Sequence, residues 1–250
     1  MLRYVLSMNI NKSIDSLVTV IESKSKASYE PNQNICSELG KISLDLLIGP
    51  YCVGKNTLMD AVVAQNNEFG VVRSFTTRPQ RFDEPSDSYR FINHDIDSLE
   101  EVVSKLNEGE LVQVAVHPYS RKVYGSELED YNKPHMMIDM LASAVSSTMK
   151  LPFKNVTVTN IVTPVDDFKR RSTVRSESNP NDDIKARRVE AIKSLEWSLS
   201  EGLLNPWIIN ADGLLQVATD SFVQSVRGEL LSSIGAIIIG QELLTELKKY

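Results

Sequence analysis

The sequence has few cysteines and few histidines. Its 250 residues include only two cysteines, Cys36 and Cys52. Two cysteines make no disulfide framework, and such a chain suits a reducing compartment, so we expect a cytoplasmic protein. The three histidines, His94, His117 and His135, stand in no HExxH or CxxC-type arrangement, which excludes a recognisable zinc motif.

Long apolar runs are absent as well. The most apolar stretch, residues 234–239, is far below the ~20 residues that a bilayer-spanning helix needs, and it predicts a core segment or an interface. The apolar stretch near the start of the chain is interrupted by Asn9, Asn11 and Lys12, which makes it too short for a secretory signal. We therefore expect no membrane partner.

Positive charge is also scarce. The chain has 27 Lys and Arg against 33 Asp and Glu, for a net charge of −6. This balance disfavours a nucleic-acid surface built from bulk positive potential, so we expect no nucleic-acid partner. The length is enough for one well-buried α/β core with extensions.

The apolar runs that are present alternate with helical patterns. Short runs with strand character are followed by helical spacing in several places, which predicts an α/β fold around a parallel sheet. Two charged helices, over residues 166–175 and 183–199, are predicted to flank a loop at residues 176–181. The predicted strands cover residues 44–48, 71–72, 111–116, 136–140, 156–162 and 207–209.

A separate helix is predicted near the N-terminus. Ser13 can cap it, and Ile14, Leu17, Val18 and Ile21 follow at helical spacing. Residues 23–34 are predicted to form a polar loop. Together they predict an N-terminal extension over residues 1–40.

The turn after the first predicted strand has the pattern of a phosphate-binding loop. Residues 49–55 match G-x-x-x-x-G-K, but Asn56 stands where the consensus has Ser or Thr. Glycines let backbone N–H groups converge on phosphate oxygens, the helix start adds its positive dipole end, and the lysine neutralises charge. A glycine-containing turn made only for packing is the alternative. The candidate ATP-binding residues are Gly49, Pro50, Tyr51, Cys52, Val53, Gly54, Lys55, Asn56 and Thr57.

Three ordered motifs together resemble the guanylate kinase family. The P-loop is followed by Ser74-Phe75-Thr76-Thr77-Arg78-Pro79-Gln80-Arg81, then by Glu84 and Tyr89-Arg90-Phe91, and later by Tyr124-Gly125-Ser126. The resemblance covers roughly residues 44–230. It implies a P-loop NTPase fold, with a central parallel sheet flanked by helices, a small acceptor-binding insertion and a lid. By this resemblance the kinase-like domain spans residues 41–230, the acceptor segment 73–135, the lid 166–190 and a C-terminal extension 231–250.

The resemblance also implies roles for single residues around an acceptor. Two arginines at i and i+3 can direct forked donors at one phosphate, whereas a solvated surface is the alternative for each arginine alone. Arg78, Arg81, Tyr89 and Tyr124 would hold the acceptor's phosphate, and Ser74, Glu84 and Ser126 would seat the nucleotide.

Further matches concern ATP and a metal ion. Arg171, Arg175 and Arg187 match the arginines of a lid that closes over ATP, and with Lys55 they are the candidate catalytic residues. Charge spreads over the transferred phosphoryl group, so such residues act by positioning and electrostatics. Asn210 matches an asparagine near the ATP base. Asp139 and Asn56 are the candidate ligands for Mg²⁺.

Two positions depart from the family where it recognises guanine. Gln113 stands at the family's glutamate and Leu141 at the second aspartate of D-x-D. A carboxylate can accept from both guanine donors, whereas an amide also presents a donor of its own. We expect ATP-dependent phosphorylation of a nucleoside monophosphate, first of all GMP or dGMP. A different phosphorylated acceptor, such as ribose 1,5-bisphosphate or another monophosphate, and a non-catalytic binding module are the alternatives. The expected partners are ATP and a small phosphorylated acceptor, for a monomer or homodimer.

Overall fold

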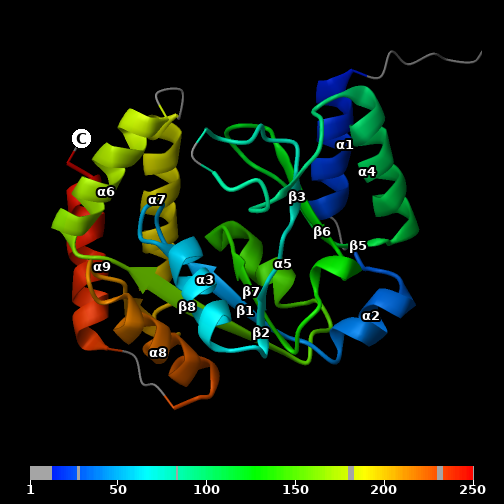
Figure 1. The fold of residues 1–250 in the computed structure, drawn as a ribbon. Coiled ribbons are helices and arrows are strands. Elements are labelled where there is room, and N and C mark those ends of the chain that lie inside the picture. The colour runs from blue at the N-terminus through cyan, green and yellow to red at the C-terminus, as the bar shows by residue number, and fades with distance from the viewer. Residues whose placement is uncertain (1–12, 27–28, 83, 180–182, 230–232, 250) are drawn as a thin grey trace, which may run out of the picture.

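A computed structural model describes residues 13–26, 29–82, 84–179, 183–229 and 233–249, and its main sheet is parallel throughout (Figure 1). The strand order is β2-β7-β1-β8-β9. The predicted α/β fold around a parallel sheet is therefore confirmed. These strands are β1 (Ser43–Ile48), β2 (Phe69–Val71), β7 (His135–Asp139), β8 (Asn155–Val162) and β9 (Trp207–Ile209).

Apolar side chains on both faces explain why these segments are central strands. Every residue of β1 is buried, as expected for a strand of a parallel sheet that helices cover on both sides. Leu44, Leu46 and Ile48 pack on one face, while Leu47 belongs to the core on the other. The first face is covered by α2 (Gln33–Leu39) and α5 (Val145–Thr148). The core on the other face contains α3 (Lys55–Gln65) and α8 (Leu215–Val226), and it continues around the sheet edge at β9 to α6 (Val165–Ser178), α7 (Ile184–Leu199) and α9 (Ile234–Leu247).

A second sheet of order β4-β3-β6-β5 lies beside the first (Figure 1). It consists of β3 (Phe75–Thr76), β4 (Arg90–Phe91), β5 (Leu111–Val116) and β6 (Val123–Glu127). Residues 111–116 form a strand, as predicted, but it lies in this second sheet, where β5 pairs antiparallel with β6. An apolar run specifies a strand but not its partner. Two short 3₁₀ helices, η1 (Leu128–Asp130) and η2 (Ala142–Ala144), follow β6 and β7.

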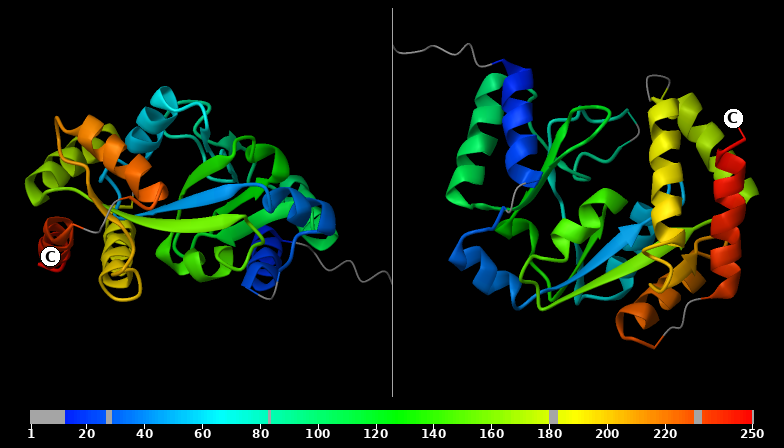
Figure 2. Two further views of the ribbon diagram at one scale, coloured as in Figure 1. Left: turned by 90° about the horizontal axis from the view of Figure 1, so that it is seen from below. Right: turned by 180° about the vertical axis from the view of Figure 1, so that it is seen from behind.

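The N-terminal helix packs on the second sheet. The predicted helix is present as α1 (Ile14–Lys26), but it runs further than expected, and Gln33 already begins α2, so the predicted loop over residues 23–34 is wrong at both ends. Leu17, Val18 and Ile21 are buried against α4 (Ile96–Glu108) and the sheet. Figure 1 and Figure 2 show α1 and α4 side by side.

The remaining predictions concern the C-terminal third. The helix α6 continues through Ser178, so residues 176–178 are helical and not part of a loop, while residues 180–182 lie outside the described residues. Residues 234–239 open α9, where Ala236 is buried and Ile234 is exposed. Within the described ranges, no helix has the length and apolar character needed to cross a lipid bilayer.

Candidate active site

The P-loop joins β1 to α3 through a turn that demands glycine twice. Gly54 has a φ of 85°, in the left-handed region, and a Cβ there would lie 2.4 Å from Nδ2 of Asn210. A Cβ at Gly49 would lie 2.3 Å from the carbonyl oxygen of Ile161. The two glycines therefore allow the loop to pass close to β8 and to the end of β9.

Lys55 lies inside this loop. Its ammonium donates to the carbonyl oxygens of Gly49 (2.6 Å) and Pro50 (2.8 Å), and it is 3.5 Å from Oδ1 of Asp139 at the end of β7. Desolvation raises the pKa of Asp139 and the nearby Glu190 carboxylate adds to this, whereas Lys55 and Arg175 oppose it. The loop lysine and the Asp139 carboxylate thus share one small region at the carboxyl ends of the strands.

Asn210 holds the far side of the loop. It is 4% exposed, and its Nδ2 donates to the carbonyl oxygens of Val53 (2.9 Å) and Gly54 (3.2 Å). The backbone carbonyl oxygen of Asn210 accepts from Thr163 Oγ1 (2.9 Å). Asn210 therefore positions the loop itself, whereas the family resemblance assigned it to the ATP base.

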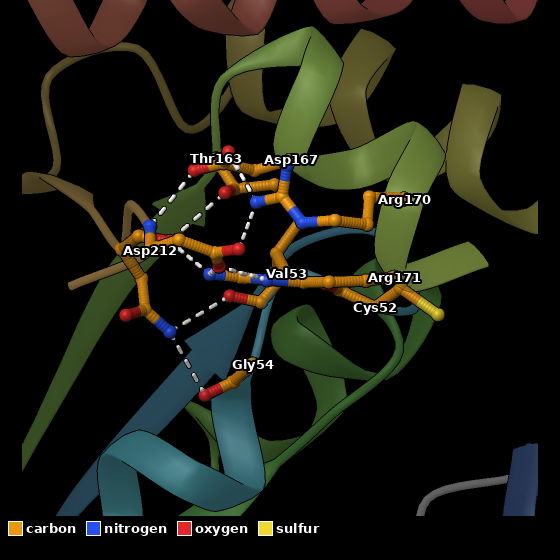
Figure 3. A network of polar contacts seen from close by, with 9 residues as sticks. Cys52, Val53, Gly54, Thr163, Asp167, Arg170, Arg171 and Asp212 are labelled. Carbon is orange, nitrogen blue, oxygen red and sulfur yellow. Dashed lines mark hydrogen bonds and ion pairs between the residues drawn. The ribbon is translucent and has the colours of Figure 1, made fainter. Parts of the chain in front are cut away.

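Arg171 connects α6 to the same place (Figure 3). Its guanidinium donates to the carbonyl oxygens of Asn210 (3.0 Å) and Cys52 (3.4 Å) and pairs with Asp212 through two nitrogens. Asp212 also accepts from Arg170, and its backbone N–H donates to Asp167 (2.8 Å). Hydrogen bonds from Arg170, then from Arg171, lower the pKa of Asp212. The base of α6 is thereby tied to the P-loop and to the turn after β9.

A hollow of about 280 Å³ opens next to this network. It is lined by Gly54 and Thr57 at the start of α3, by Arg171 and by residues 210–213. Both Asn56 and Thr57 are exposed there, immediately after Lys55. A flat ligand in this hollow would contact the guanidinium of Arg171 and the first turn of α3.

The predicted acceptor residues form a compact cluster on the second sheet. Arg78 makes two parallel hydrogen bonds to Glu84, of 2.8 Å and 2.7 Å, and its guanidinium carbon lies 5.1 Å from the ring centre of Tyr89. Tyr89 and Tyr124 stack edge to face at 6.0 Å. Desolvation would lower the pKa of Arg78, but the hydrogen bonds to Glu84 and the nearby Tyr124 outweigh it, so that this pKa is raised. Arg78 is thus fixed in place before any ligand binds.

Arg81 lies near enough to arginines of α6 and α7 for their charges to affect it. Desolvation lowers its pKa, and the positive charges of Arg78, Arg187 and Arg175 lower it further. Arg175 also hydrogen-bonds the Cys52 thiol, and desolvation raises the pKa of that thiol against the charges of Arg175, Arg187 and Lys55. The charges of Arg81, Arg175 and Arg187 therefore act on one another, and those of Arg175 and Arg187 also act on Cys52 of the P-loop.

The side chains expected to read a base are bonded within the protein. Oε1 of Gln113 lies 3.3 Å from Thr148 Oγ1, a hydroxyl that is closer, at 2.9 Å, to the carbonyl oxygen of Ala144. Ser126 is fully buried and shares a 2.9 Å hydrogen bond with the hydroxyl of Tyr131. Ser74 is buried as well, and Leu141 precedes η2 without a polar atom in its side chain. In these positions the described residues present no carboxylate to a guanine.

Sequence reasoning missed the pairing of His117 with Glu190, which lies between the second sheet and α7. Nε2 of His117 lies 3.1 Å from Oε2 of Glu190 on α7, and the backbone N–H groups of Tyr119 and Ser120 donate to the other ring nitrogen of His117. Nε2 therefore carries the proton and donates to the carboxylate. Burial would raise the pKa of Glu190, but the His117 hydrogen bond, with Lys55 and Arg187 nearby, lowers it. Glu190 follows Arg187 by three positions on one helix face, a spacing that could have pointed to it.

The candidate metal ligands, Asp139 and Asn56, suit a metal ion that takes few ligands from the protein. Among the described residues, no group of three or more His, Cys, Asp or Glu side chains is arranged to hold a metal ion. Mg²⁺ bound with a nucleotide usually takes one or two protein oxygens, water and phosphate oxygens, so it needs no such group. The Asp139 carboxylate, next to Lys55, and the exposed Asn56 amide supply oxygens of the right kind.

Comparisons with known proteins agree with the fold and go no further. No family model matches the chain, and no curated protein sequence matches it. Among solved structures, the chain is similar to the guanylate kinase from Anaplasma phagocytophilum, with 16% identity and a TM-score of 0.48 over 81% of this chain and 92% of that one. At that identity and TM-score, the likeness supports no conclusion about activity or acceptor.

Proposed function

We propose that the protein is a phosphotransferase that moves the γ-phosphoryl group of ATP to the phosphate of a nucleoside monophosphate, with GMP as the first candidate. One observation carries the proposal. Arg81 of the acceptor cluster, Arg175 of α6 and Arg187 of α7 share one electrostatic environment next to the P-loop. Such convergence of positive charge suits two phosphorylated substrates that meet end to end.

The division of roles follows from the positions of the side chains. The P-loop backbone and Lys55 would hold the β- and γ-phosphates of ATP, and a phosphate oxygen would replace the Gly49 and Pro50 carbonyls as partners of Lys55. Arg78, Arg81, Tyr89 and Tyr124 would hold the acceptor phosphate. Arg175 and Arg187 would then face the charge that develops on the transferred group.

Magnesium is proposed as the accompanying ion. It would neutralise phosphate charge when bound with ATP, and Asp139 and Asn56 are the residues of this chain that would hold it or its water molecules. Asp139 and Lys55 carry opposite charges 3.5 Å apart, so the pair keeps the carboxylate turned toward the phosphate side of the loop.

A second acceptor class is favoured by the Gln113 contact. The Gln113 side chain is neutral and lies 3.3 Å from the Thr148 hydroxyl, and Leu141 offers no polar side-chain atom, so neither position presents a carboxylate to both guanine donors. Another monophosphate or a phosphorylated sugar such as ribose 1,5-bisphosphate is therefore the alternative acceptor. The phosphate-holding cluster would serve either class.

The test is ADP release by the purified protein with ATP, Mg²⁺ and a panel of GMP, dGMP, AMP, UMP and ribose 1,5-bisphosphate. At least one acceptor should stimulate ADP release, and Lys55→Ala should reduce it by roughly 100-fold or more. Lys41→Ala is the matched control, since Lys41 lies at the opposite end of β1 and pairs with Glu38. ATP binding without acceptor-dependent ADP release for the whole panel would contradict the proposal and favour a binding module.

A further inference from the structure

The C-terminal helix α9 lies outside the part of the chain that resembles a kinase, yet it is packed against the core. Leu243 and Leu247 are buried, and Gly240 lies so close to Trp207 of β9 that a Cβ would be 2.7 Å from the indole ring. Figure 2 shows α9 alongside α7, with α6 near its end. The helix therefore covers the edge of the main sheet next to both lid helices.

Two polar contacts join α9 to α7. Nε of Arg188 donates to the carbonyl oxygen of Leu247 at 2.6 Å, and a second guanidinium nitrogen donates to the same oxygen. Nζ of Lys248 lies 2.6 Å from Oε1 of Glu196, which is about two helix turns further along α7 than Arg188. A guanidinium on a terminal helix carbonyl satisfies an acceptor that has no partner within the helix. The contacts therefore fix the end of α9 to the side of α7.

One ion pair joins α9 to α6. Nζ of Lys169 lies 2.8 Å from Oε1 of Glu246, whose side chain is 12% exposed. Hydrogen bonds from Lys169 and Lys249 lower the pKa of Glu246 to about 2, so the carboxylate is charged over the whole physiological range. Glu246 thus connects α6 to the same end of α9 that holds α7.

The helices that α9 contacts also carry residues that act near the P-loop. Arg188 turns to α9, while its neighbour Arg187 and Glu190 turn to the cleft, since adjacent residues of a helix point about 100° apart. On α6, Lys169 reaches α9 while Arg175 reaches Cys52. Fixing one side of each helix therefore fixes the direction of the arginine on its other side.

We propose that α9 is a brace that holds α6 and α7 in place, so that Arg175 and Arg187 are aimed at the P-loop before a nucleotide binds. Lys169, Glu246 and Arg188 are its positioning residues. The expected effect on catalysis rests on the proposed phosphotransfer, whereas the effect of α9 on the rigidity of α6 and α7 does not. Preorganised arginines lose less conformational freedom on binding, which lowers the cost of assembling the site.

The first test uses exchange of charge across the α6–α9 pair. Lys169→Glu and Glu246→Lys, each alone, should speed amide hydrogen exchange in α6 of the nucleotide-free protein and lower kcat/KM for ATP about fivefold, the equivalent of about 1 kcal/mol. The double variant should restore both. Arg227→Glu and Glu68→Lys form the matched control. The two side chains make an exposed ion pair, with 3.3 Å between nitrogen and oxygen, and neither residue belongs to α6 or α7.

A second variant tests the α7 contact without reversing charge. Arg188→Met keeps the aliphatic stem and removes the donors to Leu247, and it should speed amide exchange in α7 and raise the KM for ATP. Unchanged exchange and unchanged kinetics in all three variants, or no rescue in the double one, would overturn the brace. If the wild-type protein transfers no phosphoryl group, the proposed function fails, and the exchange rates still decide on the brace.

Discussion

At the scale of single residues, Arg78 is oriented by its neighbours, as the proposed binding of an acceptor phosphate requires. Its two hydrogen bonds to Glu84 and its place over the Tyr89 ring hold the guanidinium in one orientation. The planar fork of arginine matches a carboxylate or a phosphate, which a lysine ammonium cannot do. Glu84 therefore acts as an orienting partner within the cluster.

This arrangement predicts a selective effect of Arg78→Lys. The lysine keeps the charge but loses the paired hydrogen bonds to Glu84 and the contact with the Tyr89 ring, and it cannot offer two parallel donors to a phosphate. The KM for the acceptor should therefore rise about tenfold or more. The KM for ATP should stay within about twofold, because the P-loop contacts do not involve this residue. Steady-state kinetics with each substrate varied in turn checks both values.

Arg73→Lys is the control for that experiment. Arg73 lies in the same segment and makes an exposed pair with Asp87 at 2.8 Å, so its replacement should leave both constants unchanged. An equal rise in the KM for ATP and for the acceptor in Arg78→Lys would mean that Arg78 supports the fold and not the acceptor.

The residues of the site differ in how far the sequence predicts them. Arg78, Tyr89 and Tyr124 lie within ordered motifs, and the structure brings them together in one cluster. The pairing of His117 with Glu190 joins residues 73 positions apart, so no local pattern contains it. Arg171 was predicted from its match to a lid arginine of the family, whereas its contact with the Cys52 carbonyl depends on how α6 packs.

At the scale of elements, β1 carries an acidic residue through the core. Asp45 is 1% exposed, accepts from Thr157 Oγ1 and lies 4.0 Å from Nδ1 of His135. Burial raises the pKa of Asp45 to about 6, although Thr157 and His135 oppose it. The charged form is thus disfavoured in the folded protein relative to the unfolded chain.

This raised pKa predicts how stability depends on pH. The contribution of protonated Asp45 is fully present below the unfolded pKa of about 4 and is lost as the pH rises through about 6. Asp45→Asn should therefore be more stable than the wild type at pH 8, by up to about 3 kcal/mol, and the gain should shrink as the pH falls from 6 to 4. Urea unfolding at several pH values measures it, and a gain that grows toward low pH would contradict the assignment.

Elements differ in how well local sequence specifies them. The strands of the parallel sheet are rich in apolar residues, and β1, β7, β8 and β9 were predicted close to their observed places, whereas the prediction for β2, over residues 71–72, shares only Val71 with the observed strand. The strands β3 and β4 have two residues each, too few for a period to show, and β5 reads like a parallel strand although its partner is the hairpin strand β6. The partner of a strand depends on tertiary contacts that the run itself does not encode.

At the scale of the whole molecule, two bodies face each other across the P-loop. The main sheet presents Lys55 and Asp139, and the second sheet presents the Arg78 cluster. His117 reaches from the second sheet to Glu190 on α7, and Lys193 on the same helix lies 5.6 Å from the Tyr119 ring. These contacts join the second sheet to α7.

The most direct test of this arrangement follows the phosphoryl group itself. The protein is incubated with ATP labelled at the γ-phosphate, Mg²⁺ and the best acceptor of the panel, and the labelled products are separated. The account predicts label in the terminal phosphate of a new diphosphate linkage on the acceptor, and none of this product with Lys55→Ala. Label found only in inorganic phosphate, or retained in ATP with every acceptor, would contradict it.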